Sequence, residues 1–159
     1  MSADCLFVLR NVNATCELRE KLEILISSCG CGVLYEPVDA LIICKQVIIS
    51  NTDFIFEPTD YPDSISSDLL LSHENIYING ETAALPLYTR LKTIQRFAEL
   101  CIGHASPIEI YISEDNPYLP DYSLYNLTCY EIADVLYKEY QACKQPYPYI
   151  PNVHLLINH

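Results

Sequence analysis

The stretch TAALPLYTRLKTIQRFAELCIGH, residues 82–104, carries the longest helical pattern in the chain. Its apolar residues recur every three or four positions, so a helix formed here would have one continuous apolar face. That face consists of Leu87, Leu91, Ile94, Ala98 and Cys101. A helix with one apolar face must bury it against another layer of structure, which predicts a sheet or further helices beside it.

Short segments rich in branched residues lie on both sides of this helix and are typical of strands. Two further helices are expected, one from a cap at Asn13 or Thr15 to Cys29, and one from a capping box at Thr128–Glu131 to near Cys143. The order predicts a single α+β domain over residues 1–159, with about three helices packed against a largely antiparallel mixed sheet. The expected strands are Asp4–Leu9, Val33–Glu36, Leu41–Cys44, Val47–Ser50, Asp53–Glu57, Asn75–Asn79, Ile108–Ile112 and Val153–Ile157.

Length and hydropathy favour one folded domain in the cytoplasm. The 159 residues are half hydrophobic by the broad count, which is enough for a proper core. No apolar run reaches the roughly 18–20 residues of a membrane helix. The start of the chain, Met-Ser-Ala-Asp, lacks the features of a signal peptide.

The eight cysteines are predicted to be reduced thiols. Most lie in apolar strand or helix patterns, where a free thiol behaves as a small hydrophobic group. The pair Cys29-x-Cys31 could form a metal site with Cys101-x-x-His104, but zinc sites usually space their paired cysteines by two to four residues. We expect Gly30 and Gly32 to end a helix instead, and we predict neither a metal nor a cofactor.

No catalytic signature is present in the sequence. The four histidines show no helical His-x-x-x-His pairing, and a redox Cys-x-x-Cys motif and a glycine-rich phosphate loop are both missing. The adjacent acids Glu114 and Asp115 are expected to be solvated rather than to act as an acid–base pair. The sequence therefore predicts no enzyme, while a small cysteine-dependent hydrolase assembled in space stays open as an alternative.

Negative charge is concentrated in two long stretches without a single Lys or Arg. One lies between Lys45 and Arg90 and the other runs from Phe97 to Tyr137, and each contains seven Asp or Glu residues. Together the carboxylates of these two stretches carry more negative charge than the formal net charge of the whole chain, which is −12. Such a chain should repel nucleic acid and anionic membranes and attract a basic protein over long range.

Two acidic, tyrosine-bearing segments are the predicted partner-binding sites. The segment Ser113–Asn126 contains two prolines and is expected to be a restricted loop, which lowers the entropy cost of docking. Tyrosine is frequent at binding hot spots, although these tyrosines could also cover the core. The loop Glu57–Asp63 has the same character. The candidate binding residues are Glu114, Asp115, Tyr118, Asp121, Tyr122 and Tyr125 in the first segment and Asp60, Tyr61 and Asp63 in the second.

The strand, acidic tyrosine segment and capped helix of Ile108–Tyr140 resemble segments of bacterial immunity proteins. These are the small cytoplasmic antidotes of contact-dependent growth inhibition and related polymorphic toxin systems. The resemblance implies one-to-one binding of a cognate toxin domain, usually a basic nuclease, whose Lys and Arg groups the carboxylates would pair with. It supplies no motif from which individual binding residues can be carried over.

The alternative functions are a nucleic-acid mimic that blocks a DNA-binding enzyme and an adaptor subunit. Neither nucleic acid nor a membrane is an expected partner. The oligomeric state stays open.

Overall fold

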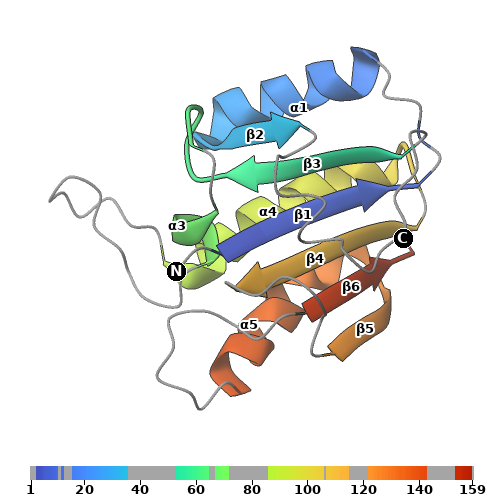
Figure 1. Cartoon of the computed structure of the whole chain (residues 1–159). Helices are drawn as coiled ribbons and strands as arrows, with labels where there is room; N and C mark the ends of the chain where they lie inside the picture. Colours follow the sequence, from blue (N-terminus) through green and yellow to red (C-terminus); the bar gives the residue numbers. More distant parts are fainter. Residues whose placement is uncertain are drawn as a thin grey trace, which may run out of the picture.

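The computed structural model describes residues 3–10, 12, 16–35, 53–64, 67–71, 86–105, 107–114, 122–142 and 153–158. These residues form one six-stranded mixed sheet with helices packed on it, so the predicted α+β class is confirmed (Figure 1). The elements are β1 (Ala3–Leu9), α1 (Cys16–Cys29), β2 (Gly32–Tyr35), β3 (Phe54–Thr59), α3 (Asp68–Leu71), α4 (Leu87–Ile102), β4 (Ile108–Glu114), β5 (Tyr122–Leu127), the 3₁₀ turn η1 (Cys129–Glu131), α5 (Ile132–Ala142) and β6 (Val153–Ile157).

The sheet has the strand order β2-β3-β1-β4-β6-β5. Every neighbouring pair is antiparallel except β5 and β6, which run parallel. The central strand β1 pairs with β4 along its whole length, from Ala3 opposite Glu114 to Leu9 opposite Ile108. The largely antiparallel arrangement that the sequence predicts is therefore correct.

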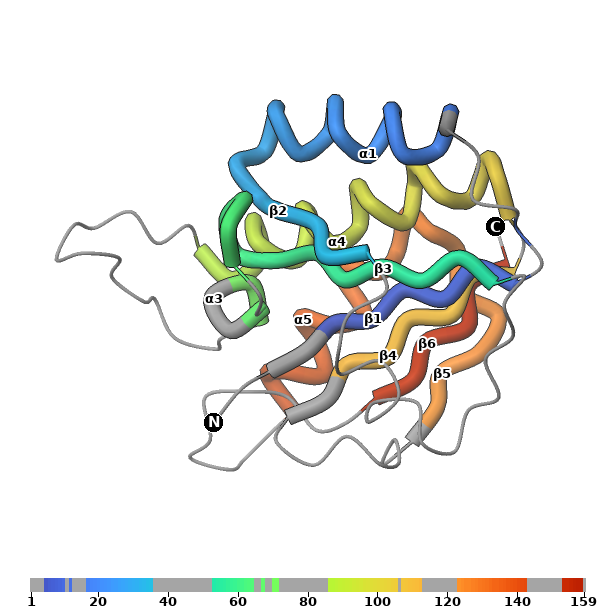
Figure 2. The backbone as a smooth tube through the Cα atoms, turned by 45° about the horizontal axis from the view of Figure 1, so that its top comes forward, coloured from blue at the N-terminus to red at the C-terminus, as the bar shows by residue number. Residues whose placement is uncertain are grey.

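The helices α1, α4 and α5 cover one face of the sheet, and the core lies between the two layers (Figure 2). Alternate strand residues point to this face, as the two-residue period of a strand requires. In β1 these are Cys5, Phe7 and Leu9, all fully buried. The ring of Phe7 stacks on Phe56 at 4.8 Å between centroids and meets Phe97 of α4 edge-on at 6.3 Å.

The helix ends follow the local chemistry that the sequence indicates, except that Gly32, which was also predicted to end a helix, begins β2. Gly30 takes a φ of +73° directly after α1 and donates its N–H to the Ile26 carbonyl at 3.0 Å, a left-handed ending that favours glycine. The Thr128 N–H donates to Glu131 Oε1 at 2.7 Å in the predicted capping box. The helix predicted over 82–104 begins later, at Leu87 after Pro86, and residues 82–85 lie outside the described part.

The prediction that Ser113–Asn126 is one loop is wrong at both ends. Ser113 and Glu114 belong to β4, and Tyr122–Leu127 forms β5 beside β6. The prolines and acids between these two segments suggested a single loop and obscured the apolar–polar alternation of Ser123, Leu124 and Tyr125. The predicted loop Glu57–Asp63 also begins too early, because β3 continues to Thr59. The predicted strands Leu41–Cys44, Val47–Ser50 and Asn75–Asn79, together with Cys143, lie outside the described residues.

None of the helices in the described ranges has the length and apolar character required to cross a membrane.

Candidate functional site

The nine predicted binding residues are spread over two separate regions, and the structure describes the side chains of four of them. Glu114 ends β4 and Tyr122 begins β5, but their side chains are outside the described part, as are Asp115, Tyr118 and Asp121 altogether. The four that can be placed are Asp60, Tyr61 and Asp63 in the turn after β3, and Tyr125 in β5.

The turn after β3 uses its first acid to hold the fold together. Asp60 Oδ1 accepts the backbone N–H of Leu70 at 3.0 Å, which fixes the short helix α3 to the turn. The Tyr61 carbonyl accepts the Thr59 hydroxyl at 3.1 Å. The side chains of Tyr61, 48% exposed, and Asp63 point to solvent. These two residues are therefore available to a partner, whereas Asp60 already has a structural bond.

Tyr125 is presented by an irregularity in the outermost strand. The pairing of β5 with β6 shifts between Leu124 and Leu127, and Asn126 has a φ of 58°. A bulge of this kind redirects a side chain and interrupts pairing along an edge. Tyr125 is 60% exposed as a result.

Tyr130, 69% exposed in η1, is a further surface tyrosine near this edge that the sequence reasoning missed. It lies inside the predicted capping box, and that local pattern drew attention to the helix start rather than to the side chain between its two ends. No signal in the sequence separates an exposed tyrosine at such a position from a buried one.

The turn after β3 and the β5 edge do not form one continuous site. Three strands, β1, β4 and β6, separate β3 from β5. At about 4.8 Å per strand spacing, the two elements are about 19 Å apart across the sheet. Tyr61 and Tyr125 would therefore contact different parts of a partner.

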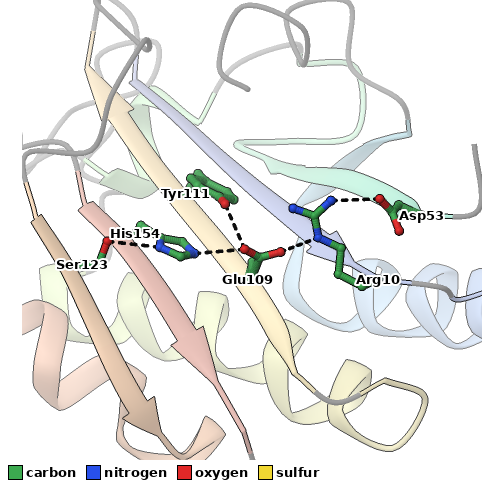
Figure 3. A network of polar contacts seen from close by, with 6 residues as sticks. All are labelled: Arg10, Asp53, Glu109, Tyr111, Ser123 and His154. Carbon is green, nitrogen blue, oxygen red and sulfur yellow. Dashed lines mark hydrogen bonds and ion pairs between the residues drawn. The ribbon is translucent and has the colours of Figure 1, made fainter. Parts of the chain in front are cut away.

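A polar network occupies the face of the sheet that points away from the helices (Figure 3). We call it the sheet network. At its centre Glu109 Oε2 accepts Arg10 Nε at 2.6 Å, and Glu109 Oε1 accepts the Tyr111 hydroxyl at 3.0 Å. Arg10 also donates through Nη1 to Asp53 Oδ2 at 2.9 Å. Its members are Arg10, Asp53, Glu109, Tyr111, Ser123 and His154.

His154 connects this network to the exposed strand β5. Its ring stacks on Tyr111 at 4.4 Å and meets the ring of Tyr125 edge-on at 6.4 Å. Its Nδ1 lies 3.2 Å from Ser123 Oγ. Its Nε2 lies 3.3 Å from Glu109 Oε1, a distance that makes an ion pair when the ring is protonated. Tyr125 therefore rests against His154, which belongs to a network that joins residues of β4, β5 and β6 to Arg10 and Asp53.

The partners of Glu109 keep its carboxyl ionised. Burial raises the pKa of this group, but the contacts from His154, Arg10 and Tyr111 and the charge of Arg10 outweigh it and lower the pKa to about 2. Burial works to lower the pKa of Arg10, and its bonds to Glu109 and Asp53 raise it overall. Glu109 and Arg10 are therefore both charged at neutral pH, and the ion pair between them lies at the centre of the sheet network.

Charged residues are unequally divided between the two layers. Of the Lys and Arg residues that the structure describes, Arg10 alone lies outside the helices, and it is bound by two carboxylates. The rest belong to α1, α4 and α5: Arg19, Lys21, Arg90, Lys92, Arg96 and Lys138. The strands on the other side thus present no uncompensated cation within the described ranges.

Several acids that the sequence counts as surface charge are internal. Glu57, which was predicted to open a surface loop, is buried in β3. Asp53 and Glu109 share Arg10. These acids add to the net charge, which acts at long range, but they cannot make direct contacts with a partner.

The cysteines near α1 and α4 do not come together as a metal site. Cys31 and Cys101 are both buried, and burial raises the pKa of the Cys31 thiol to about 12 and also raises that of Cys101. His104 Nε2 is instead 3.3 Å from Lys21 Nζ. Across the described ranges no three His, Cys, Asp or Glu side chains are grouped to hold a metal ion.

No family model matches the chain, and no curated protein or solved structure matches it either.

Proposed function

We propose that this protein is a non-enzymatic, cytoplasmic immunity protein that binds and neutralises a basic toxin domain, in the manner of contact-dependent growth inhibition. The observation that carries the proposal is the division of charge between the two layers. On a chain of net charge −12, the described cations are on the helices, apart from the bound Arg10. Within the described residues, the strand side has no cation apart from the bound Arg10 to repel a basic partner, while the net negative charge attracts one.

Recognition would then proceed in two physical steps. The net negative charge of the whole molecule steers a cationic toxin toward it and raises the association rate. Short-range binding then depends on groups that can be desolvated against the toxin. Tyr61 and Tyr125 are exposed, are anchored by the turn and by the sheet network, and have the residue type most often found at hot spots.

The nucleic-acid mimic finds less support in the geometry. A mimic needs exposed carboxylates spaced like phosphates along one face. Among the described carboxylates of the strand layer, Asp53 and Glu109 bind Arg10 and Glu57 is buried, so exposed Asp63 has no row of such neighbours. A toxin inhibitor needs no such regular row.

A hydrolase is the second candidate, because one specific arrangement favours it. Ser123 Oγ, His154 and Glu109 form a sequence of contacts similar in order to a Ser–His–acid triad. The acid, however, is bound by Arg10, whose charge offsets the field with which Glu109 would stabilise a protonated imidazole. A fluorophosphonate probe decides between the two: labelling of the protein that disappears in Ser123→Ala would support hydrolysis and contradict the inhibitor proposal.

The inhibitor proposal predicts that a large secreted protein is encoded immediately upstream, and it is tested in a bacterial host with the C-terminal domain of that protein. Expression of that domain alone should stop growth, and co-expression of this protein should restore it. The purified pair should form a one-to-one complex whose association slows as salt rises. Absence of protection, or an association rate that does not change with salt, would contradict the proposal.

Tyr125→Ala is the variant that examines the binding surface. Because Tyr125 is exposed, its loss should leave stability nearly unchanged but weaken the complex by about 1–4 kcal/mol, the range of a hot-spot residue. Tyr88→Ala, an exposed tyrosine on helix α4, is the matched control and should not change affinity. Equal affinity of the Tyr125 variant and the unmodified protein would remove the β5 edge from the interface.

A further inference from the structure

A cleft between helices α1 and α4 has a chemical character unlike that of the rest of this acidic protein. Both helices belong to the layer that packs on the sheet (Figure 2). The volume of the cleft is about 260 Å³. Its lining consists of Lys21, Ile24, Leu25 and Ser28 from α1, and Arg96 and Leu100 from α4.

The helical spacing explains why these groups meet. Lys21, Ile24 and Ser28 follow one another at intervals of three and four along α1, so they share one face. Arg96 and Leu100 are four apart on α4 and share the facing side in the same way. Leu25 is largely buried, whereas Ile24 is 71% exposed. The cleft thus has an apolar floor with an exposed aliphatic group beside it.

The two cations at the cleft have only modest partners. Arg96 Nη2 reaches across to Ser28 Oγ at 3.4 Å, a long bond to a neutral hydroxyl. The ion pairs between described residues do not include Arg96. Lys21 pairs with Glu17 at 3.2 Å and lies 3.3 Å from His104 Nε2, but both contacts are exposed, and an exposed ion pair contributes little. A carboxylate entering the cleft could therefore bind both cations at small cost.

The size of the cleft indicates which kind of ligand it takes. Pockets for free small molecules usually measure about 300–1,000 Å³ and enclose most of the ligand. The present cleft is smaller and open, which suits one or two apolar side chains projecting from a larger body. A groove between two helices is also the usual receptor for an amphipathic helix.

We propose that the α1–α4 cleft docks an acidic amphipathic helix of a protein partner. One apolar side chain of that helix would lie on Leu25 and Leu100 beside Ile24. Its carboxylates would form charge-assisted hydrogen bonds with Lys21 and Arg96. This partner is opposite in charge to the basic toxin domain and lies against the other layer, so the inference does not depend on the proposed function.

The probe is a fluorescein-labelled peptide with Leu at every third or fourth position, Glu beside the Leu stripe and Ala elsewhere, measured by fluorescence anisotropy with the full chain. The unmodified protein should bind it, and Arg96→Glu and Ile24→Asp should each weaken binding by about tenfold or more. Lys138→Glu removes a cation of the same layer outside the cleft and should change the affinity by less than about twofold. All these side chains lie at the surface or at the cleft, so each variant should fold, and circular dichroism checks this.

Three outcomes overturn the proposal. The first is no binding of the peptide by the unmodified protein. The second is equal weakening by Lys138→Glu and Arg96→Glu, because binding would then follow net charge alone. The third is that the peptide does not bind, but the protein binds vesicles of phosphatidylserine or self-associates as its concentration rises, and Arg96→Glu abolishes that association. The cleft would then serve a lipid surface or a second copy of the chain.

Discussion

Replacing Glu109 by Gln would remove the charge at the centre of the sheet network while keeping nearly the same shape. The pKa of this carboxyl falls from its usual value near 4.5 to about 2 in the folded protein. At about 1.36 kcal/mol per pKa unit, this lowering of the pKa corresponds to about 3 kcal/mol of stability at neutral pH. Water at this partly exposed site screens some of that energy, so we expect Glu109→Gln to lower the free energy of unfolding by about 2 kcal/mol.

The sign of the pH dependence follows from the direction of the shift. Because the folded state lowers the pKa, the contribution is fully present above the unfolded pKa, near 4.5, and is lost as pH falls toward 2. Urea unfolding at pH 7 and at pH 3 gives the difference between the unmodified protein and the variant at each pH. At pH 3 this difference should be less than half of its value at pH 7.

The control is Glu17→Gln, which removes an exposed carboxylate paired with Lys21 on α1. Its effect should stay within about 0.5 kcal/mol at both pH values. If the Glu109 variant loses the same stability at pH 3 as at pH 7, the loss comes from altered shape and not from ionisation. If it loses none at pH 7, the sheet network contributes nothing to stability, and the reasoning from its bonds is refuted.

Three further predictions test how the fold is held. Gly32→Ala should destabilise the protein by about 1–3 kcal/mol in urea unfolding, because an added Cβ would meet the backbone of the turn after β3 at 2.5 Å; unchanged stability would mean that this turn can move away. Thr128→Ala should cost about 1 kcal/mol by removing one half of the capping box with Glu131, and no loss would show that the box adds nothing to α5. Finally, Cys101 is buried with a raised thiol pKa, so mass-spectrometric mapping should find it modified by iodoacetamide only when the chain unfolds and well after the half-buried Cys29; early labelling would contradict the packing of α4.

The elements with strong local signals could be predicted from the sequence. The apolar stripe of α4 identified Leu91, Ile94, Ala98 and Cys101 as core residues, and all four are fully buried. The capping box placed the start of the last helix correctly because its chemistry involves residues only three apart. Such patterns involve residues that are close together in the sequence, so they can be recognised without knowledge of the tertiary structure.

The sheet network could not be predicted, because it depends on strand register. Glu109 reads as an ordinary polar residue of a half-exposed strand, and His154 reads as a lone histidine in an apolar one. They meet only because β6 pairs with β4 so that Tyr111 lies opposite His154. That pairing joins residues more than forty positions apart, and no local pattern specifies it.

In the acidic stretches, too, no local pattern shows which carboxylates the fold leaves exposed. A run of acids without bases fixes the net charge, and the long-range field follows from that sum wherever the individual carboxylates lie. Direct contact is different, because it requires exposed groups, and Asp53, Glu57 and Asp60 already have positions inside the fold. The charge therefore explains why a basic partner would approach. Exposed tyrosines such as Tyr125, supported by a network that the sequence does not reveal, would decide which partner stays bound.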